Sequence, residues 1–449
     1  MTKPGFGMHD DVNVESGDSG SERRPGPEEE LAALERADLL RRLRTFEACG
    51  GRGLDLHHAA GSGTPGTGLV EFASNDYLGL ARHPGVIEAV AEGLRRFPAG
   101  AAASRLICGG SPAHALLEEK LAEFKQTEAA LLFGSGFAAA SGALPALLGG
   151  DDFVLLDKLS HACLIDGARL SGATMRVFPH QRLDKLEQLL AWCRARARRG
   201  ARILIVTESV FSMDGDQTDL DTLIELKRRH GALLMLDEAH AIGVIGPQGR
   251  GLAAVGDWQE QVDFHMGTLS KAVGLAGGYI AARRQWIDLL VNKARSFIFS
   301  TAPPPALAWG AVAALELLQG REGDRLRATL QERVGQLRSS LAGAGVGAGP
   351  GPVRVPPEWP QDRGGGVSAI VPLLTGDTVR AMDLAQSLMR AGYLVPAIRY
   401  PTVPRNAARL RLSLSSEHEA VQIEGLVAHL GRALADGGGG PAEELRGQG

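Results

Sequence analysis

Lys271 lies in an unusually apolar stretch of the sequence, "HMGTLSKAVGLAGGYIAA", which runs from 265 to 282. Apart from the opening histidine it is the only acidic or basic residue there, and two hydroxyl residues, Thr268 and Ser270, precede it. A surface lysine would extend its stem into water. In a dry pocket, burial lowers the pKa of the ammonium and makes the amine available as a nucleophile or base.

A carboxylate and a glycine-rich turn occur in similar positions. Asp237 directly follows the apolar run "ALLML", where a buried carboxylate requires a cation or a hydrogen-bond donor. Gly134-Ser135-Gly136-Phe137 follows the apolar run "AALLF", and a glycine turn that opens a helix offers N–H groups to an anion. Each feature alone is typical of an ordinary cap or tight turn, and no P-loop lysine follows the turn.

Together, the three features match the requirements of pyridoxal 5′-phosphate (PLP). This cofactor has a phosphate, a ring nitrogen that favours an acidic partner, and an aldehyde that forms a Schiff base with lysine. His161 and Ser212 follow two further apolar runs, in "KLSHACLIDG" and "VFSMDGD". The sequence therefore predicts a PLP site in which Lys271 binds the cofactor covalently.

The elements that would position these residues are short apolar runs, which predict buried strands at 129–133, 153–157, 174–178, 203–208, 232–238 and 263–267. Helical patterns such as "LDTLIELKRRH" lie between them. Strands that alternate with helices are typical of a mostly parallel sheet with helices on both faces. Ligands bind beyond the carboxyl ends of such strands, so the predicted site lies at one edge of the sheet.

The chain of 449 residues is long enough for a large α/β domain with an appendage. The run "EEELAALERADLLRRLRTFEA" predicts an amphipathic N-terminal helix that ends near Cys49. Sparser strands after about residue 310 indicate a smaller α+β domain. We expect a disordered tail (1–28), a helix and lead-in segment (29–100), a large PLP-binding α/β domain (101–309), a small C-terminal α+β domain (310–435) and a second disordered tail (436–449).

Composition argues against several classes of partner. The net charge is −4, from 48 basic and 52 acidic residues, so we expect no affinity for nucleic acid or membranes. The four cysteines have no metal-binding or redox-motif spacing, which predicts no metal site and fits a reducing compartment. The N-terminus lacks the apolar core of a signal peptide, and no run approaches a membrane span. We therefore expect a cytoplasmic protein.

A series of motifs in this sequence resembles the α-oxoamine synthases, a family of fold-type-I PLP-dependent enzymes. The motifs are "SNDYLGL", "SRLICGGSPAHALLE", "GSGFAA", "LSHACLIDG", "TESVFSMDGD", "LDEAHAIGVIGPQGRG", "GTLSKAVG" and "AIRYPTVP" followed by "RLRLSLS". They extend over nearly all of the chain except its tails. The resemblance implies the fold-type-I architecture, with a smaller C-terminal domain, and a homodimer with sites at the interface.

The resemblance also implies a role for each matching residue. Lys271 would form the Schiff base, Asp237 would pair with the pyridinium nitrogen, His161 would stack on the ring, and His240 would bond the ring's 3-oxygen. The other implied cofactor contacts are Gly136, Phe137, Ser212, Thr268 and, from a partner subunit, Ser300 and Thr301. The implied substrate contacts are Arg41, Asn75, His161, Arg399, Thr402 and Arg411.

The implied reaction is a decarboxylative condensation of an amino acid with an acyl thioester. The motifs "FSMDGD", "GVIGPQGRG" and "IRYPTVP" favour the family member of biotin biosynthesis, which joins L-alanine to a pimeloyl group carried by CoA or an acyl carrier protein. Other members of the family use glycine or serine with a different acyl-CoA. An aminotransferase would also need the lysine and the aspartate but would release no thiol. A non-catalytic binding protein is a further alternative, against which the presence of Lys271 argues.

Two positions depart from the family pattern. The segment "AGAAAS" (99–104) stands where the family often has a glycine-rich run, and alanine restricts φ where glycine does not. Tyr400 replaces a residue that is more often small or proline. Both differences bear on the entry of the acyl chain.

Overall fold

The computed structural model describes residues 25–37, 39–48, 52–57, 68–256, 258–347, 353–356 and 365–435. The chain divides into two compact units between Arg44 and Thr45, and each is described by itself. The predicted tails at 1–28 and 436–449 lie outside the described residues, apart from 25–28. The domain boundaries predicted from the sequence stay predictions.

The first unit contains the helix α1 (Pro27–Arg36), which carries three glutamates in its first turn and buries no side chain. The prediction that this helix continues to Cys49 is wrong, because the helix ends at Arg36 and Thr45–Ala48 forms strand β1. β1 pairs antiparallel with β2 (Gly53–His57) in the second unit. An exposed helix gains little from packing, so strand pairing decides the conformation of these residues.

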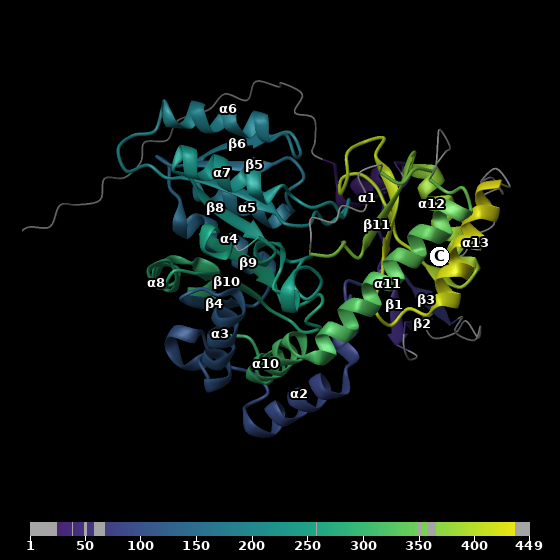
Figure 1. The fold of residues 1–449 in the computed structure, drawn as a ribbon, viewed down its shortest axis with the longest axis horizontal. Helices are drawn as coiled ribbons and strands as arrows, with labels where there is room; N and C mark the ends of the chain where they lie inside the picture. The colour runs from purple at the N-terminus through teal and green to yellow at the C-terminus, as the bar shows by residue number, and fades with distance from the viewer. Residues whose placement is uncertain are drawn as a thin grey trace, which may run out of the picture. The chain divides into compact units, whose positions relative to one another are not determined.

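A seven-stranded sheet forms the centre of the second unit (Figure 1). Its strands, in spatial order, are β4 (Ala129–Phe133), β10 (Gly278–Ala282), β9 (Phe264–Thr268), β8 (Leu233–Asp237), β7 (Ile203–Glu208), β5 (Phe153–Asp157) and β6 (Thr174–Phe178). Neighbouring strands are parallel except β10, which is antiparallel to both β4 and β9. The predicted mostly parallel α/β fold is confirmed. β10 was not predicted, because its glycine and alanine residues have low strand propensity.

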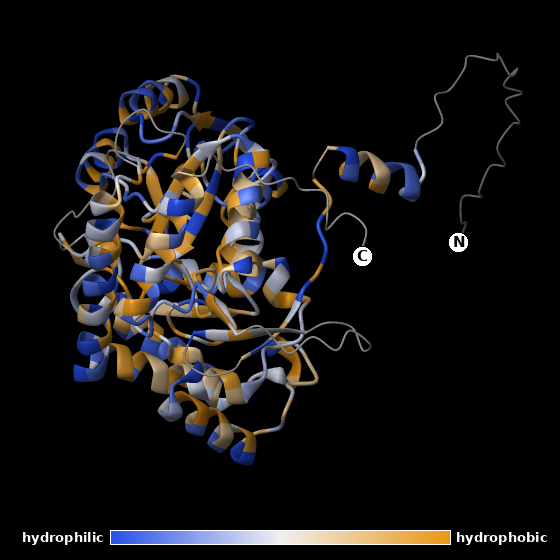
Figure 2. Cartoon of the chain, turned by 90° about the vertical axis from the view of Figure 1, so that its right-hand side faces the viewer, coloured by the Kyte–Doolittle hydropathy of each residue, from blue (hydrophilic) through white to orange (hydrophobic). Residues whose placement is uncertain are grey.

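Helices cover both faces of this sheet because its strands are apolar on both sides. Leu204 and Val206 pack with the helices of one face, whereas Ile203 and Ile205 pack with those of the other. The first face carries α4 (Gly136–Leu147), α5 (Ala162–Ser171), α8 (Arg284–Lys293) and α9 (Arg295–Ile298). The second carries α3 (Pro112–Lys125), α6 (Leu183–Arg194), α7 (Leu220–His230) and α10 (Pro305–Gln319). Figure 2 shows hydrophobic residues along the central strands and hydrophilic residues on the outer helices.

The C-terminal part of the second unit contains a three-stranded antiparallel sheet of β11 (Ile370–Gly376), β14 (Ala408–Ser413) and β13 (Ala397–Ile398). The helix α12 (Thr378–Arg390) packs on this sheet, and α13 (Ala420–Ala435) packs on α12 and on the long helix α11 (Arg321–Gly343). These strands lie in the region after about residue 310 in which the sequence predicted sparser strands.

Segments that precede the large sheet in the sequence pair with this C-terminal part. β3 (Leu69–Glu71) pairs antiparallel with β2 and parallel with β12 (Tyr393–Leu394). The helix α2 (Pro84–Arg96) packs instead on α10, beneath the large sheet in Figure 1. The short helical turns are Leu80–Arg82, Arg105–Gly109, Pro247–Gly249, Leu252–Ala254 and Gln259–Gln261. Within the described ranges, no helix is both long enough and apolar enough to cross a membrane.

Candidate active site

A cavity of about 190 Å³ lies beyond the carboxyl ends of β4, β5, β7, β8 and β9. It is lined by residues at the ends of these strands and in the segments that follow them: Ser135, Gly136, Phe137, His161, Cys163, Glu208, Asp237, Ala239, His240, Met266, Thr268, Ser270 and Lys271. The structure therefore brings together seven of the sequence-predicted site residues, from positions 136 to 271. Parallel strands place these turns side by side although they are distant in sequence.

The glycine-rich turn forms one wall of the cavity. Ser135 caps α4 by accepting the Ala138 N–H with its side-chain oxygen at 3.1 Å, so the helix begins at Gly136. The first N–H groups of such a helix are suited to bind an anion. A β-carbon at Gly136 would lie 3.4 Å from the Thr268 side chain, an ordinary van der Waals contact, so the turn lies directly against the end of β9. The Thr268 hydroxyl contacts the Ser270 hydroxyl at 2.8 Å on the same wall.

Lys271 and His240 contact each other in the same cavity. The Lys271 Nζ and the His240 Nε2 are 2.8 Å apart. Burial lowers the pKa of Lys271, although the charges of Asp237 and Glu208 oppose this effect. Burial and the charge of Lys271 hold the pKa of His240 well below its usual range, so the imidazole is neutral at pH 7. Its Nδ1 lies 2.7 Å from the Tyr77 hydroxyl.

Two buried carboxyl groups, Asp237 and Glu208, line the same cavity. Burial raises the pKa of Asp237, whereas the Lys271 charge and the N–H of Ala239, which donates to Asp237 Oδ1 at 2.9 Å, lower it. Burial and the nearby Asp237 charge raise the pKa of Glu208 well above its usual range. Two buried carboxylates cannot both ionise cheaply, so this pair retains a proton more readily than two exposed carboxyl groups would.

His161 begins α5 and extends over the cavity. Its backbone N–H donates to Glu208 Oε1 at 2.6 Å, and its Nδ1 lies 3.0 Å from the Cys163 sulfur. Burial lowers the pKa of His161, although the charge of Asp237 opposes this. The hydrogen bond from the His161 backbone N–H to Glu208 fixes the position of the residue. Its neutral imidazole can then present a flat face to a ring in the cavity.

A chain of hydrogen bonds leads from the cavity to the C-terminal sheet. The Tyr77 hydroxyl, which contacts His240, donates to Asn75 Oδ1 at 3.1 Å. Arg411, on β14, donates from Nη2 to the same oxygen at 3.0 Å. Its Nε donates to the backbone carbonyl of Ser212 at 2.6 Å. Asn75, Arg411 and Ser212 thus lie beside the cavity rather than in its lining.

Four other predicted residues do not line the cavity, and a fifth is not placed. Ser300 and Thr301 are exposed, and Thr301 forms a backbone bridge with Ser104. Arg399 contacts the Met382 sulfur at 3.3 Å, and the Thr402 backbone N–H donates to the Arg399 carbonyl at 3.0 Å. Arg41 belongs to the first unit, whose position relative to the second is not determined.

Glu208 and Tyr77 are site residues that the sequence reasoning missed. Glu208 ends the apolar run "ILIVT" just as Asp237 ends "ALLML", so the same strand-end signal could have identified it. Tyr77 carries no such signal, because it contacts His240 from a segment outside the sheet.

The residues that line the cavity fit PLP. The buried Lys271 amine, the buried Asp237 carboxylate and the N-terminus of α4 with the Thr268 hydroxyl correspond to its aldehyde, ring nitrogen and phosphate. Among the described residues, no group of three or more His, Cys, Asp or Glu side chains forms a metal site.

Comparisons with known proteins agree with this geometry. A sequence profile named "Aminotransferase class I and II" matches residues 67–430. The chain is 43% identical over 404 residues to an 8-amino-7-oxononanoate synthase of Geobacter sulfurreducens, covering 90% of this chain and 96% of that protein. It is similar to a serine palmitoyltransferase from S. paucimobilis with PLP and myriocin bound, with a TM-score of 0.80, 27% identity, and coverage of 91% of this chain and 97% of the other. An 8-amino-7-oxononanoate synthase from Francisella tularensis matches with a TM-score of 0.65, 26% identity, and coverage of 82% and 98%. The chain therefore belongs to the aminotransferase class I and II family and, within it, to the 8-amino-7-oxononanoate synthases.

Proposed function

We propose that this protein catalyses the PLP-dependent, decarboxylative condensation of L-alanine with a pimeloyl thioester to give 8-amino-7-oxononanoate, carbon dioxide and the free thiol carrier. The observation that carries the proposal is the hydrogen-bonded series Lys271, His240, Tyr77, Asn75 and Arg411. The series connects two groups of the site. One is the Lys271 amine, which would carry out the reaction, and the other is the Arg411 guanidinium, which would hold the carboxylate of an amino acid. The names of the relatives support this product.

Arg411 is arranged to bind a carboxylate. Its Nε, Nη1 and Nη2 each donate one hydrogen bond, to Ser212, Ser413 and Asn75. A guanidinium has five N–H groups. The planar fork of a guanidinium favours a bidentate contact with the two oxygens of a carboxylate. A carboxylate held there fixes which bond to Cα faces the Lys271 amine.

Lys271 is the residue that would move the proton. When bound, PLP supplies an electron sink for the pair left by the broken Cα–H bond. The Lys271 Nζ takes the Cα proton of L-alanine, and Cα then bonds to the thioester carbonyl carbon. The carrier leaves as a thiol, the original carboxylate is lost as carbon dioxide, and a proton returns to Cα. The lowered pKa of Lys271 suits both proton transfers.

The remaining parts of the site would come from a second copy of the chain. We propose a homodimer in the cytoplasm in which Ser300 and Thr301 contact the phosphate in the partner's cavity. Support comes from their exposure and from the exposed apolar side chains beside them, Phe299 at 71% and Ile107 at 79%. Apolar side chains so exposed favour contact with another protein surface.

The test is a substrate screen on the purified protein. PLP is combined with alanine, glycine or serine and with a panel of acyl-CoA and acyl-carrier thioesters, while thiol release and product mass are followed. We expect turnover with alanine and a pimeloyl donor and none in Lys271→Ala. The control Lys293→Ala removes an exposed lysine of α8 and should retain wild-type turnover. Turnover only with glycine or serine, or activity that persists in Lys271→Ala, would contradict the proposal.

A further inference from the structure

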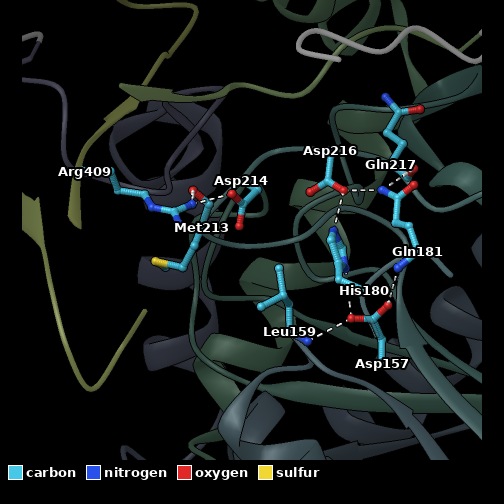
Figure 3. Close-up of polar contacts among 9 residues, drawn as sticks. All are labelled: Asp157, Leu159, His180, Gln181, Met213, Asp214, Asp216, Gln217 and Arg409. Carbon is cyan, nitrogen blue, oxygen red and sulfur yellow. Dashed lines mark hydrogen bonds and ion pairs between the residues drawn. The ribbon is translucent and has the colours of Figure 1, made fainter. Parts of the chain in front are cut away.

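The segment 211–217, here called the 211–217 loop, follows β7 and contacts the C-terminal sheet. Two arginines of β14 bind it. Arg411 donates to the Ser212 carbonyl. Arg409 forms an ion pair with Asp214 (Figure 3). Gly215 has a φ of +71°, and a β-carbon there would collide with the Ile370 carbonyl of β11. The loop therefore supplies one of the hydrogen bonds that position the Arg411 guanidinium, beside those to Ser413 and Asn75.

His180 connects this loop to the large sheet from the other side. Its Nδ1 lies 2.9 Å from Asp157 Oδ1 at the end of β5, and its Nε2 lies 2.9 Å from Asp216 Oδ2 in the loop. The ring also packs edge-on against Phe211, with centroids 4.4 Å apart. Figure 3 shows His180 between the two carboxylates, with the Arg409–Asp214 pair at the other end of the same segment.

The two carboxylates that His180 bridges, Asp157 and Asp216, also accept hydrogen bonds from neighbouring groups. Asp157 also accepts the backbone N–H of Leu159 at 2.8 Å and that of Gln181 at 3.0 Å, so it is fixed to the sheet edge. The Gln181 amide donates to Asp216 as well. Asp216 Oδ1 is buried without a hydrogen bond, so its other oxygen carries the contacts that anchor the loop.

We propose that His180 is a positioning residue for the amino-acid site: by bridging Asp157 and Asp216, it holds the 211–217 loop and, through the Ser212 carbonyl, the Arg411 guanidinium. The inference rests on the proposed function, because it takes Arg411 as the ligand of the substrate carboxylate. His180 itself does not line the cavity.

A cation is required at this position for electrostatic reasons. Two carboxylates that share one partner repel each other unless a charge lies between them. Only the protonated imidazole donates from both ring nitrogens at once. Charge-assisted hydrogen bonds are about twice as strong as neutral ones, so loss of His180 would release the loop more than loss of a neutral contact would.

The experiment compares His180→Gln with the wild type by steady-state kinetics. We expect KM for L-alanine to rise about tenfold while KM for the acyl donor changes less than about twofold and kcat falls less than KM rises. The matched control is His83→Gln. His83 caps α2, and its side chain has the same 25% exposure as that of His180. An unchanged KM for L-alanine in His180→Gln would overturn the inference. A fall in kcat of about tenfold without a rise in KM would overturn it as well.

A second variant guards against misfolding. Asp216→Asn keeps the His180–Asp157 contact and should raise KM for L-alanine in the same way, and the double variant should be no worse than the worse single variant, because both remove one bridge. Independent, multiplicative effects would count against the bridge.

Hydrogen exchange separates this inference from the proposed function. Peptides that contain residues 211–217 should exchange faster in His180→Gln than in the wild type and in His83→Gln, in the full chain and without any substrate. If the wild type does not turn over L-alanine, the proposed function fails, and faster exchange of this loop still supports the bridge. If the 211–217 loop exchanges at the same rate in His180→Gln as in the wild type, the proposed bridge is wrong, whatever the substrate of the enzyme.

Discussion

His180 and His240 carry the same side chain in opposite protonation states. Burial and the Lys271 charge hold the pKa of His240 well below its usual range. Burial also lowers the pKa of His180, but hydrogen bonds and charges from Asp157 and Asp216 outweigh it and raise the pKa to about 10. His240 is therefore a neutral imidazole that shares a hydrogen bond with Lys271, whereas His180 is a cation at pH 7.

The raised pKa of His180 predicts a pH-dependent contribution to stability. A group whose pKa is higher in the folded state than its ordinary 6.5 stabilises the fold fully below that value and loses the effect as pH rises towards about 10. We expect the difference in unfolding free energy between wild type and His180→Gln to be largest near pH 6 and to shrink by about pH 10. Urea denaturation across this range measures it, and a difference that is constant with pH would contradict the prediction.

Among the elements, the turn at 99–104 shows how an alanine segment replaces glycine. Ala102 adopts a φ of +57°, and the Ala103 N–H donates to the Ala101 carbonyl at 2.8 Å, which together describe a tight three-residue turn. The turn directs Ala103 to accept the Ala302 N–H at 3.0 Å, beside Thr301. The alanine segment therefore forms this turn at a cost in backbone strain.

Replacing this residue by glycine should relieve the strain. We expect Ala102→Gly to raise the unfolding free energy by about 0.5–1 kcal/mol, because the left-handed region is accessible to glycine. Ala101→Gly, next to it and without a positive φ, should instead lower stability by a similar amount. Thermal unfolding measures both, and a loss of stability in Ala102→Gly would show that the turn is not strained.

At the scale of the whole molecule, a buried ion pair connects the helix α3, which covers one face of the large sheet, to the strand end that carries Asp237. Lys125, at the end of α3, and Glu238, next to Asp237, are 1% and 0% exposed. Lys125 also donates to the Arg250 carbonyl, and His265 of β9 lies 3.3 Å from Glu238. Burial raises the pKa of Glu238, but Lys125 and His265 outweigh it and lower the pKa to about 2. The pair holds the strand end from which Asp237 reaches the cavity.

Removing only the Lys125 charge should destabilise the protein more than removing the charges of both Lys125 and Glu238. We expect Lys125→Met to lower the unfolding free energy by about 3–5 kcal/mol, because it leaves a buried carboxylate with one partner fewer. The double variant Lys125→Met/Glu238→Gln should recover part of the loss. Arg95→Ala, which breaks an exposed pair with Glu88, should cost less than about 1 kcal/mol. Denaturant unfolding distinguishes these outcomes, and additive losses in the double variant would contradict the prediction.

The sequence by itself determined the large sheet and most of the cofactor site. Buried parallel strands appear as short apolar runs, and their ligands follow at the carboxyl ends, so Lys271, Asp237 and the turn at Gly136 could be identified locally. The tertiary structure alone decided which strands β1 and β10 pair with, the role of Tyr77, and the bridge made by His180. These features depend on contacts between residues far apart in the chain, and on burial, which sets the protonation of each group only after the strands and loops have come together.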